Sequence, residues 1–159
     1  MAAFEKTESG KRLSKVIYDS YVDLHTRAGQ GAFVVWIAIN VPAELFLGFE
    51  NVVYGVPESH SAMNAGKGVG VVQCEKAEQI GYSMDLCSYA RIDIGCVADG
   101  GKDSPSFGLP KPDLLVSEIT TALCWSNGLT CITGKWACRI LSSTCRFVMN
   151  PRRKRTGYI

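Results

Sequence analysis

Apolar positions in the first part of the chain predict a helix and then a buried strand. From Lys11 to about Gly29, apolar residues recur at intervals of three and four, the spacing of one helix face. The members of this face are Leu13, Val16, Ile17, Tyr21 and Leu24. His25 is interpreted as a surface residue that complements the helix dipole. The apolar run that follows, 31–40 (GAFVVWIAIN), is typical of a strand buried on both faces of a parallel sheet.

The next segment predicts a return to a second strand. Pro42 is placed to open a helix at its first turn. Three apolar residues in and after that helix are expected to face the sheet: Leu45, Phe46 and Phe49. Residues 52–56 form a candidate second strand that Pro57 ends. The order strand, helix, strand predicts a right-handed crossover and an α/β fold with a parallel sheet and flanking helices.

Further along, the pattern predicts another helix, a loop and a strand. Residues 71–80 read as a helix in which Cys74 packs against its neighbours. Residues 99–112 are rich in Gly, Asp, Ser and Pro and have no period, so we expect a loop there. Residues 111–117 predict a turn followed by a short buried strand.

The composition narrows the class of protein. The 159 residues suffice for one domain with its own core, and the apolar and charged fractions are those of an ordinary globular protein. The polar first residues lack the apolar core of a secretory signal, and the longest apolar run, 32–39, is too short to span a bilayer. We therefore expect a cytoplasmic protein, without membrane contact, whose seven cysteines are reduced.

The charge of the chain identifies no particular partner. The net charge is +2, and the basic residues cluster only in the run 152–155 near the end. Such a run can contact nucleic acid. A solvated tail, or the product of a truncated or shifted reading frame, accounts for it better, because no aromatic platform accompanies it. We expect no nucleic-acid partner.

Two titratable residues follow the predicted second strand. Glu58 and His60 lie directly after it, and in open α/β sheets the loops at the carboxyl ends of strands bind ligands. A general acid–base role for this pair is one interpretation. The alternative is a helix-capping segment with a solvated glutamate and histidine.

Cys87 lies where a helix is expected to begin. Ser83 or Asp85 can cap that helix, which places Cys87 in its first turn, where free amides and the helix dipole favour a thiolate. Arg91 then lies four residues further along the same face. A thiolate binds metal or attacks a substrate, whereas the alternative is a small buried apolar residue. Cys131 repeats the arrangement after a polar turn, and cysteines from two such elements could meet at one metal centre.

Three segments resemble a known family. They are 57–63 (PESHSAM), 74–95 (CEKAEQIGYSMDLCSYARIDIG) and 109–117 (LPKPDLLVS), in that order. Together they are similar to the 2-hydroxyacyl-CoA dehydratase and benzoyl-CoA reductase family, and the resemblance covers roughly residues 31–136. It implies a flavodoxin-like or Rossmann-like parallel sheet that forms the N-terminal part of a larger subunit of an anaerobic enzyme. It also implies a [4Fe–4S] cluster held by three cysteines.

The resemblance assigns cluster ligands and divides the chain. Cys87 matches the first cluster cysteine; Cys131 is the better match to the second, with Cys124 as the alternative, and the third is expected from a C-terminal domain. The division is a helical segment at 1–30, an α/β domain with the cluster cysteines at 31–138, and a divergent basic tail at 139–159.

The resemblance implies the chemistry and the partners. The expected function is low-potential, one-electron reduction of an acyl-CoA thioester, by a dehydratase or a benzoyl-CoA reductase. The expected partners are a homologous second subunit, an ATP-dependent iron–sulfur activator or equivalent subunits, and the acyl-CoA substrate. One alternative is a truncated, non-catalytic remnant or electron-transfer and assembly module of the same fold. Another is a small flavodoxin-like binding protein with structural cysteines.

Overall fold

The computed structural model describes residues 7–118, 139–141 and 145–149. The elements, in chain order, are α1 (Glu8–Gly29), β1 (Phe33–Ile37), α2 (Glu44–Leu47), β2 (Val52–Gly55), α3 (Pro57–Gly66), α4 (Gly70–Gln79), α5 (Ser88–Ala98), β3 (Leu114–Glu118), β4 (Arg139–Leu141) and β5 (Cys145–Met149). Strands alternate with helices up to β3, which confirms the α/β prediction.

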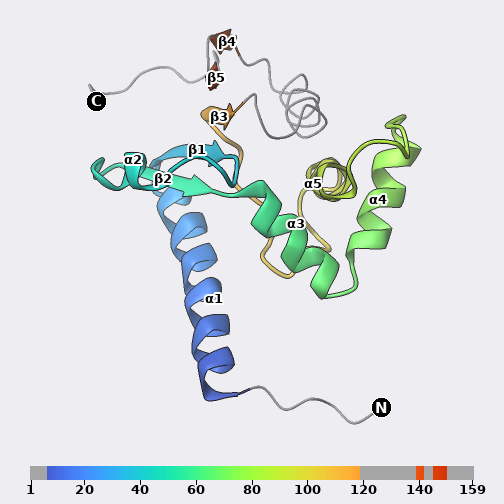
Figure 1. Ribbon diagram of the computed structural model, residues 1–159, viewed down its shortest axis with the longest axis horizontal. Helices are drawn as coiled ribbons and strands as arrows, with labels where there is room; N and C mark the ends of the chain where they lie inside the picture. Colours follow the sequence, from blue (N-terminus) through green and yellow to red (C-terminus); the bar gives the residue numbers. More distant parts are fainter. Residues whose placement is uncertain (1–6, 119–138, 142–144, 150–159) are drawn as a thin grey trace.

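The sheet has the strand order β2-β1-β3-β5-β4 (Figure 1). β1 pairs in parallel with β2 on one side and with β3 on the other, so that Val35 lies opposite both Tyr54 and Leu114. Helices flank these three parallel strands, an arrangement consistent with a flavodoxin-like fold. The predicted parallel sheet is therefore confirmed.

β1 forms the centre of the core because its residues are apolar on both faces. Val35 and Trp36 are completely or almost completely buried. The Trp36 indole Nε1 donates to the carbonyl oxygen of Pro110 at 2.8 Å, which satisfies its one polar atom. The Val34 amide donates to Asp113 Oδ2 at 2.9 Å, which extends the link between β1 and the segment before β3.

Helix α1 is longer than predicted and is mostly uncovered. It begins at Glu8 rather than Lys11 because Thr7 caps it, with the Thr7 hydroxyl accepting from the Gly10 amide at 3.2 Å. Leu24 is buried against the sheet, but Val16 remains 64% exposed. Figure 1 shows why: α1 extends away from the sheet for most of its length. The amphipathic pattern is present, and only its C-terminal end contacts the described core.

Two predictions about side chains near the sheet are wrong. Leu45 and Phe49 do not face the sheet; they are 62% and 50% exposed, because α2 is only a single short turn. Phe46 alone of the predicted three packs against the core. His25 is not a dipole-complementing surface residue either. Its half-buried Nε2 lies 3.0 Å from the Ser106 carbonyl oxygen, so it joins α1 to the loop before β3.

The segment after residue 138 contributes strands to the sheet. β5 pairs antiparallel with β3, and β4 pairs antiparallel with β5. The prediction of a solvated tail is therefore wrong for residues 139–141 and 145–149, which pair in the sheet. The basic run 152–155 lies outside the described residues. Among the helices that the structure describes, none is both long and apolar enough to cross a membrane.

Candidate functional site

The strand order indicates where a ligand binds. β1 is followed by β2 on one side of it, and the chain then crosses to β3 on the other side, so the strand order reverses at β1. In open α/β sheets, ligands occupy the crevice outside the carboxyl ends of the strands at such a reversal. The candidate site is therefore the end of β1, beyond Ile37, and the residues that other elements bring to it.

Glu58 reaches this end of β1 from the first turn of α3. Its Oε1 accepts a hydrogen bond from the Ile39 amide at 3.2 Å. Its Oε2 is buried and has no hydrogen-bond partner among the described residues. Burial raises the pKa of the Glu58 carboxyl, and the nearby Asp93 carboxylate raises it further. The interpretation of Glu58 as a solvated residue is wrong, because its side chain is half-buried and one of its carboxyl oxygens is both buried and without a hydrogen-bond partner among the described residues.

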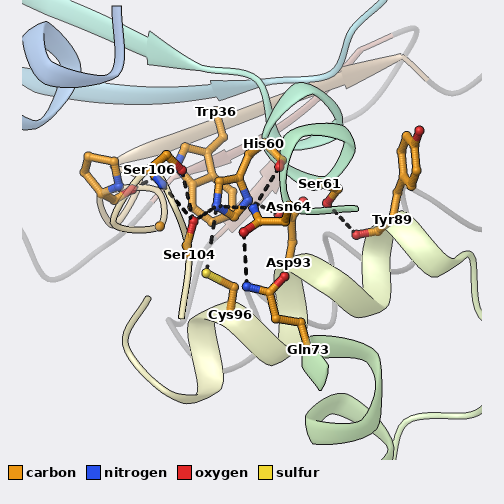
Figure 2. A network of polar contacts seen from close by, with 12 residues as sticks. Trp36, His60, Ser61, Asn64, Gln73, Tyr89, Asp93, Cys96, Ser104 and Ser106 are labelled. Carbon is orange, nitrogen blue, oxygen red and sulfur yellow. Dashed lines mark hydrogen bonds and ion pairs between the residues drawn. The ribbon is translucent and has the colours of Figure 1, made fainter. Parts of the chain in front are cut away.

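His60 is buried in the same helix, with only 1% of its surface exposed. The expected loop after the second strand is instead α3, which Pro57 opens at its first position. His60 therefore points into the protein, where its Nδ1 lies 2.5 Å from Asp93 Oδ1 of α5 (Figure 2). A solvated histidine is ruled out.

The hydrogen bonds around His60 define its tautomer. The Asn64 amide nitrogen Nδ2 donates to the His60 carbonyl oxygen at 2.8 Å and lies 2.9 Å from His60 Nε2. Asn64 Oδ1 in turn accepts from Gln73 Nε2 at 3.2 Å, which fixes the orientation of the amide. Nε2 is thus the acceptor, and Nδ1 carries the proton that is donated to Asp93.

Ser104 completes a chain of polar groups that has the order of a hydrolase triad. Its hydroxyl oxygen lies 3.0 Å from His60 Nε2, on the opposite side of the ring from Asp93. A nucleophile needs to meet its substrate, however, and Ser104 and His60 are 7% and 1% exposed. The arrangement therefore ties the 99–112 loop to α3 and α5 instead of presenting a nucleophile.

Cys87 is the N-cap residue of α5 and does not lie in its first turn. The helix begins at Ser88, and the Cys87 carbonyl oxygen accepts the Arg91 amide at 3.0 Å. Neither predicted capping residue caps the helix: the Ser83 hydroxyl instead accepts from the Asp85 amide, within the preceding turn. The thiol is half-buried and still lies at the amino end of a helix.

The Arg91 side chain is bonded to groups other than the Cys87 thiol. Its guanidinium forms an ion pair with Glu78 of α4 and donates from Nε to the Leu86 carbonyl oxygen at 3.1 Å. Besides Cys87, the cysteines whose side chains the structure describes are Cys74, which is half-buried, and Cys96, which is buried. Cys131 and Cys124 lie outside the described residues. Within the described part of the chain, no three His, Cys, Asp or Glu side chains gather into a metal site.

Comparison with characterised proteins identifies the family, although no family model matches the chain. The chain is 34% identical to the alpha subunit of (R)-2-hydroxyisocaproyl-CoA dehydratase from Clostridioides difficile, over 70% of this chain. It is 40% identical to the alpha subunit of (R)-phenyllactyl-CoA dehydratase from Clostridium sporogenes over 55% of this chain, and 36% identical to that of (R)-2-hydroxyglutaryl-CoA dehydratase from Acidaminococcus fermentans over 54%. Similarity extends to a benzoyl-CoA reductase subunit from Thauera aromatica, at 25% identity over 60% of this chain.

The chain belongs to the 2-hydroxyacyl-CoA dehydratase and benzoyl-CoA reductase family. A match that spans 70% of the chain has to include its middle, and with it Glu58, His60 and Cys87. The chain spans only 27%, 21% and 18% of the length of the three dehydratase subunits. The predicted resemblance to this family is thus confirmed, for the part of the dehydratase subunits that this chain matches.

In this member of the family, sequence reasoning missed most of the polar network around His60. Asp93 stands between Ile92 and Ile94 in a helix. A charged residue within an apolar run was the one feature of the sequence that could have predicted a buried carboxyl there. Asn64, four residues after His60, was predictable as its neighbour on a helix face. Ser104 was not, because only the tertiary structure returns the 99–112 loop to α3.

Proposed function

We propose that this chain is part of an iron–sulfur subunit of a 2-hydroxyacyl-CoA dehydratase or benzoyl-CoA reductase, which reduces an acyl-CoA thioester by one electron at low potential. The observation that carries the proposal is the match to the alpha subunit of (R)-2-hydroxyisocaproyl-CoA dehydratase, which spans 70% of this chain and therefore includes Glu58 and Cys87. The proposal covers the whole enzyme's chemistry, of which this chain supplies a portion.

Cys87 is the proposed cluster ligand on the described part of the chain. Iron–sulfur clusters are held by cysteine thiolates, and the Cys87 thiol lies at the amino end of α5, half-buried. Cys131, with Cys124 as the alternative, is proposed as the second ligand, and the third is expected from a further domain. When bound, a [4Fe–4S] cluster would supply the low-potential electron transfer.

Glu58 is the proposed acid–base residue. Its free Oε2 lies in the first turn of α3, at the end of β1, and burial raises the pKa of its carboxyl, which favours holding a proton. It can donate that proton to a leaving hydroxyl group or receive one from the substrate. His60 engages both ring nitrogens inside the protein, so we assign it no direct proton transfer to substrate.

The proposed partners follow from the family. The relatives are named as alpha subunits, which supports a second, homologous subunit. An ATP-dependent iron–sulfur activator, or equivalent subunits, would deliver the electron, and an acyl-CoA thioester would be the substrate. The reduced thiols and the oxygen-sensitive chemistry fit an anaerobic cytoplasm.

Anaerobic reconstitution tests the cluster assignment. Incubation of the full chain with iron and sulfide, together with its partner subunit, should produce a broad visible absorption that Cys87→Ser diminishes. Cys74→Ser is the matched control, because Cys74 is also half-buried but donates to the Ser88 carbonyl oxygen at 3.6 Å. Equal cluster content in the Cys87→Ser protein and the wild type would exclude Cys87 as a ligand.

A second candidate is a non-catalytic electron-transfer or assembly module with the same fold. EPR of the reduced, reconstituted complex with candidate acyl-CoA thioesters distinguishes the two. An EPR signal that changes when an acyl-CoA thioester is added supports the catalytic subunit. A cluster signal that no thioester changes supports the non-catalytic module.

A further inference from the structure

The interior behind α3 contains a buried histidine–carboxyl pair that the proposed reaction does not use. Asp93 and His60 are each 1% exposed, and their bond joins α5 to α3. Burying a carboxylate is costly unless partners compensate. Asp93 Oδ1 has its partner in His60, but Oδ2 has no hydrogen-bond partner among the described residues. A buried carboxyl with an unpartnered oxygen lowers the stability of the fold, so a role of Asp93 in placing or charging its neighbours would explain its presence.

The pair is the centre of a set of bonds that fixes the first two turns of α3. One residue after His60, the Ser61 hydroxyl donates to the Tyr89 carbonyl oxygen of α5 at 2.7 Å. Asn64 is bonded to Gln73 of α4 at 3.2 Å. Figure 2 shows these side chains converging on His60 from α3, α4, α5 and the 99–112 loop. The start of α3 therefore has little freedom to rotate or slide against its neighbours.

Glu58 lies within this fixed turn, two residues before His60. On a helix, that spacing sends the two side chains to opposite sides. His60 faces Asp93 in the interior, and Glu58 faces the end of β1, where Ile39 binds its Oε1. The same short stretch of helix thus connects the buried pair to the candidate acid–base residue.

We propose that His60 and Asp93 are positioning residues for Glu58: they fix the first turn of α3 and hold a negative charge behind it, so that the Glu58 carboxyl keeps its free oxygen at the end of β1. This inference rests on the proposed function for the role of Glu58, and its test reads the carboxyl itself rather than turnover.

The charges around the pair support this role. Burial raises the pKa of Asp93, and the hydrogen bond with His60 opposes that rise and so favours the carboxylate. The other titratable groups that sense Asp93 are Glu58 of α3, Tyr21 of α1 and Cys96 of α5. Burial, with Asp93 adding to it, raises the pKa of Tyr21 and of Cys96 to about 12, so both are neutral near pH 7. Burial is the main cause of the raised pKa of Glu58, and the Asp93 carboxylate adds to it.

Titration of Glu58 tests the proposal. The full chain, labelled with ¹³C at the glutamate carboxyls, gives a resonance for Glu58 that Glu58→Gln assigns by its disappearance. Asp93→Asn removes the charge, so the Glu58 pKa should shift downward. His60→Gln should shift it in the same direction, because the His60 bond lowers the pKa of Asp93 and its loss favours the neutral acid.

Two controls separate charge from packing. Gln73→Met disturbs the buried network without removing a charge, and it should leave the Glu58 pKa raised. Asp19→Asn removes a negative charge from the exposed surface of α1, and it should also have no effect. If neither Asp93→Asn nor His60→Gln folds, His60→Asn is the reserve variant; its shorter side chain also loses the bond to Asp93 Oδ1, so it should give the same downward shift.

An unchanged Glu58 pKa in the folded variants, or a shift in Gln73→Met equal to that in Asp93→Asn, would overturn the proposal. Its failure is distinct from failure of the proposed function. A Glu58 pKa that responds as expected, in an enzyme whose turnover Glu58→Gln does not affect, would leave the positioning in place and remove Glu58 from the chemistry.

Discussion

Gly95 of α5 lies against the backbone of Gln73 in α4, so closely that a Cβ on Gly95 would lie 1.9 Å from the Gln73 carbonyl oxygen. Only a residue without a side chain permits this crossing. The crossing fixes the position of α5, and α5 carries Asp93 and follows directly from Cys87. A glycine far from the sheet edge is thereby part of what places the candidate site.

Gly95→Ala should therefore destabilise the protein. The clash involves backbone atoms, which cannot move aside as a flexible side chain can, so we expect a loss of about 3 kcal/mol, the upper end of the range for overpacked interiors. Urea denaturation followed by circular dichroism measures it. Gly66→Ala is the matched control: at the end of α3, a Cβ on Gly66 would meet no atom within 4 Å, so this variant should be neutral or stabilise by up to about 1 kcal/mol. Equal stability of the two variants would contradict this account of the crossing.

The sequence predicted the layers of the fold and less of the site. The run around Trp36 and the proline at 57 mark β1 and the start of α3, because local composition decides both. The exposure of Leu45 was missed, because α2 stops after one turn, at Gly48, and is too short to present an apolar face to the sheet. Glu58 and Cys87 were predicted as site residues from their places next to predicted strand and helix ends and from the family resemblance, and both assignments stay predictions. The burial of His60 was missed, because its partner Asp93 is distant in the sequence and only the packing of α5 on α3 brings them together.

The Asp113 side chain, just before β3, should stabilise the fold by accepting the hydrogen bond of the Val34 amide. Its backbone amide donates to the Val34 carbonyl oxygen at 2.8 Å, and its side chain accepts the Val34 amide at 2.9 Å. Asp113→Ala leaves the buried Val34 amide without that partner, which costs about 1–3 kcal/mol. Asp113→Asn keeps an oxygen acceptor, so we expect a smaller loss in thermal or chemical denaturation. An equal loss in the two variants would show that the negative charge of Asp113, which both variants lack, matters more than its acceptor oxygen.

Cys96 should resist alkylation in the folded protein. It is 2% exposed, so the reagent can hardly reach it. Burial also raises the pKa of its thiol to about 12, so little of the reactive thiolate is present near pH 8. Brief anaerobic treatment with iodoacetamide, followed by peptide mass spectrometry, should find Cys87 modified and Cys96 unmodified. After unfolding in urea the two should be modified alike. Rapid labelling of Cys96 in the native protein would mean that α5 opens far more often than its packing against α4 implies.

Glu58→Gln should stabilise the protein more as the pH rises. Because burial raises the pKa of Glu58 above its ordinary value of 4.5, the folded state favours the protonated form. Below pH 4.5 the glutamate is protonated in both states, and the substitution should change the free energy of unfolding little. As the pH rises from there through the raised pKa, the wild type has to ionise a half-buried group and loses stability that the glutamine variant keeps. Urea denaturation at pH 4 and pH 8 measures the difference, with Glu44→Gln on the exposed start of α2 as the control. A difference between wild type and Glu58→Gln that is constant with pH, or that shrinks as the pH rises, would contradict the raised pKa and with it the case for Glu58 as a proton donor.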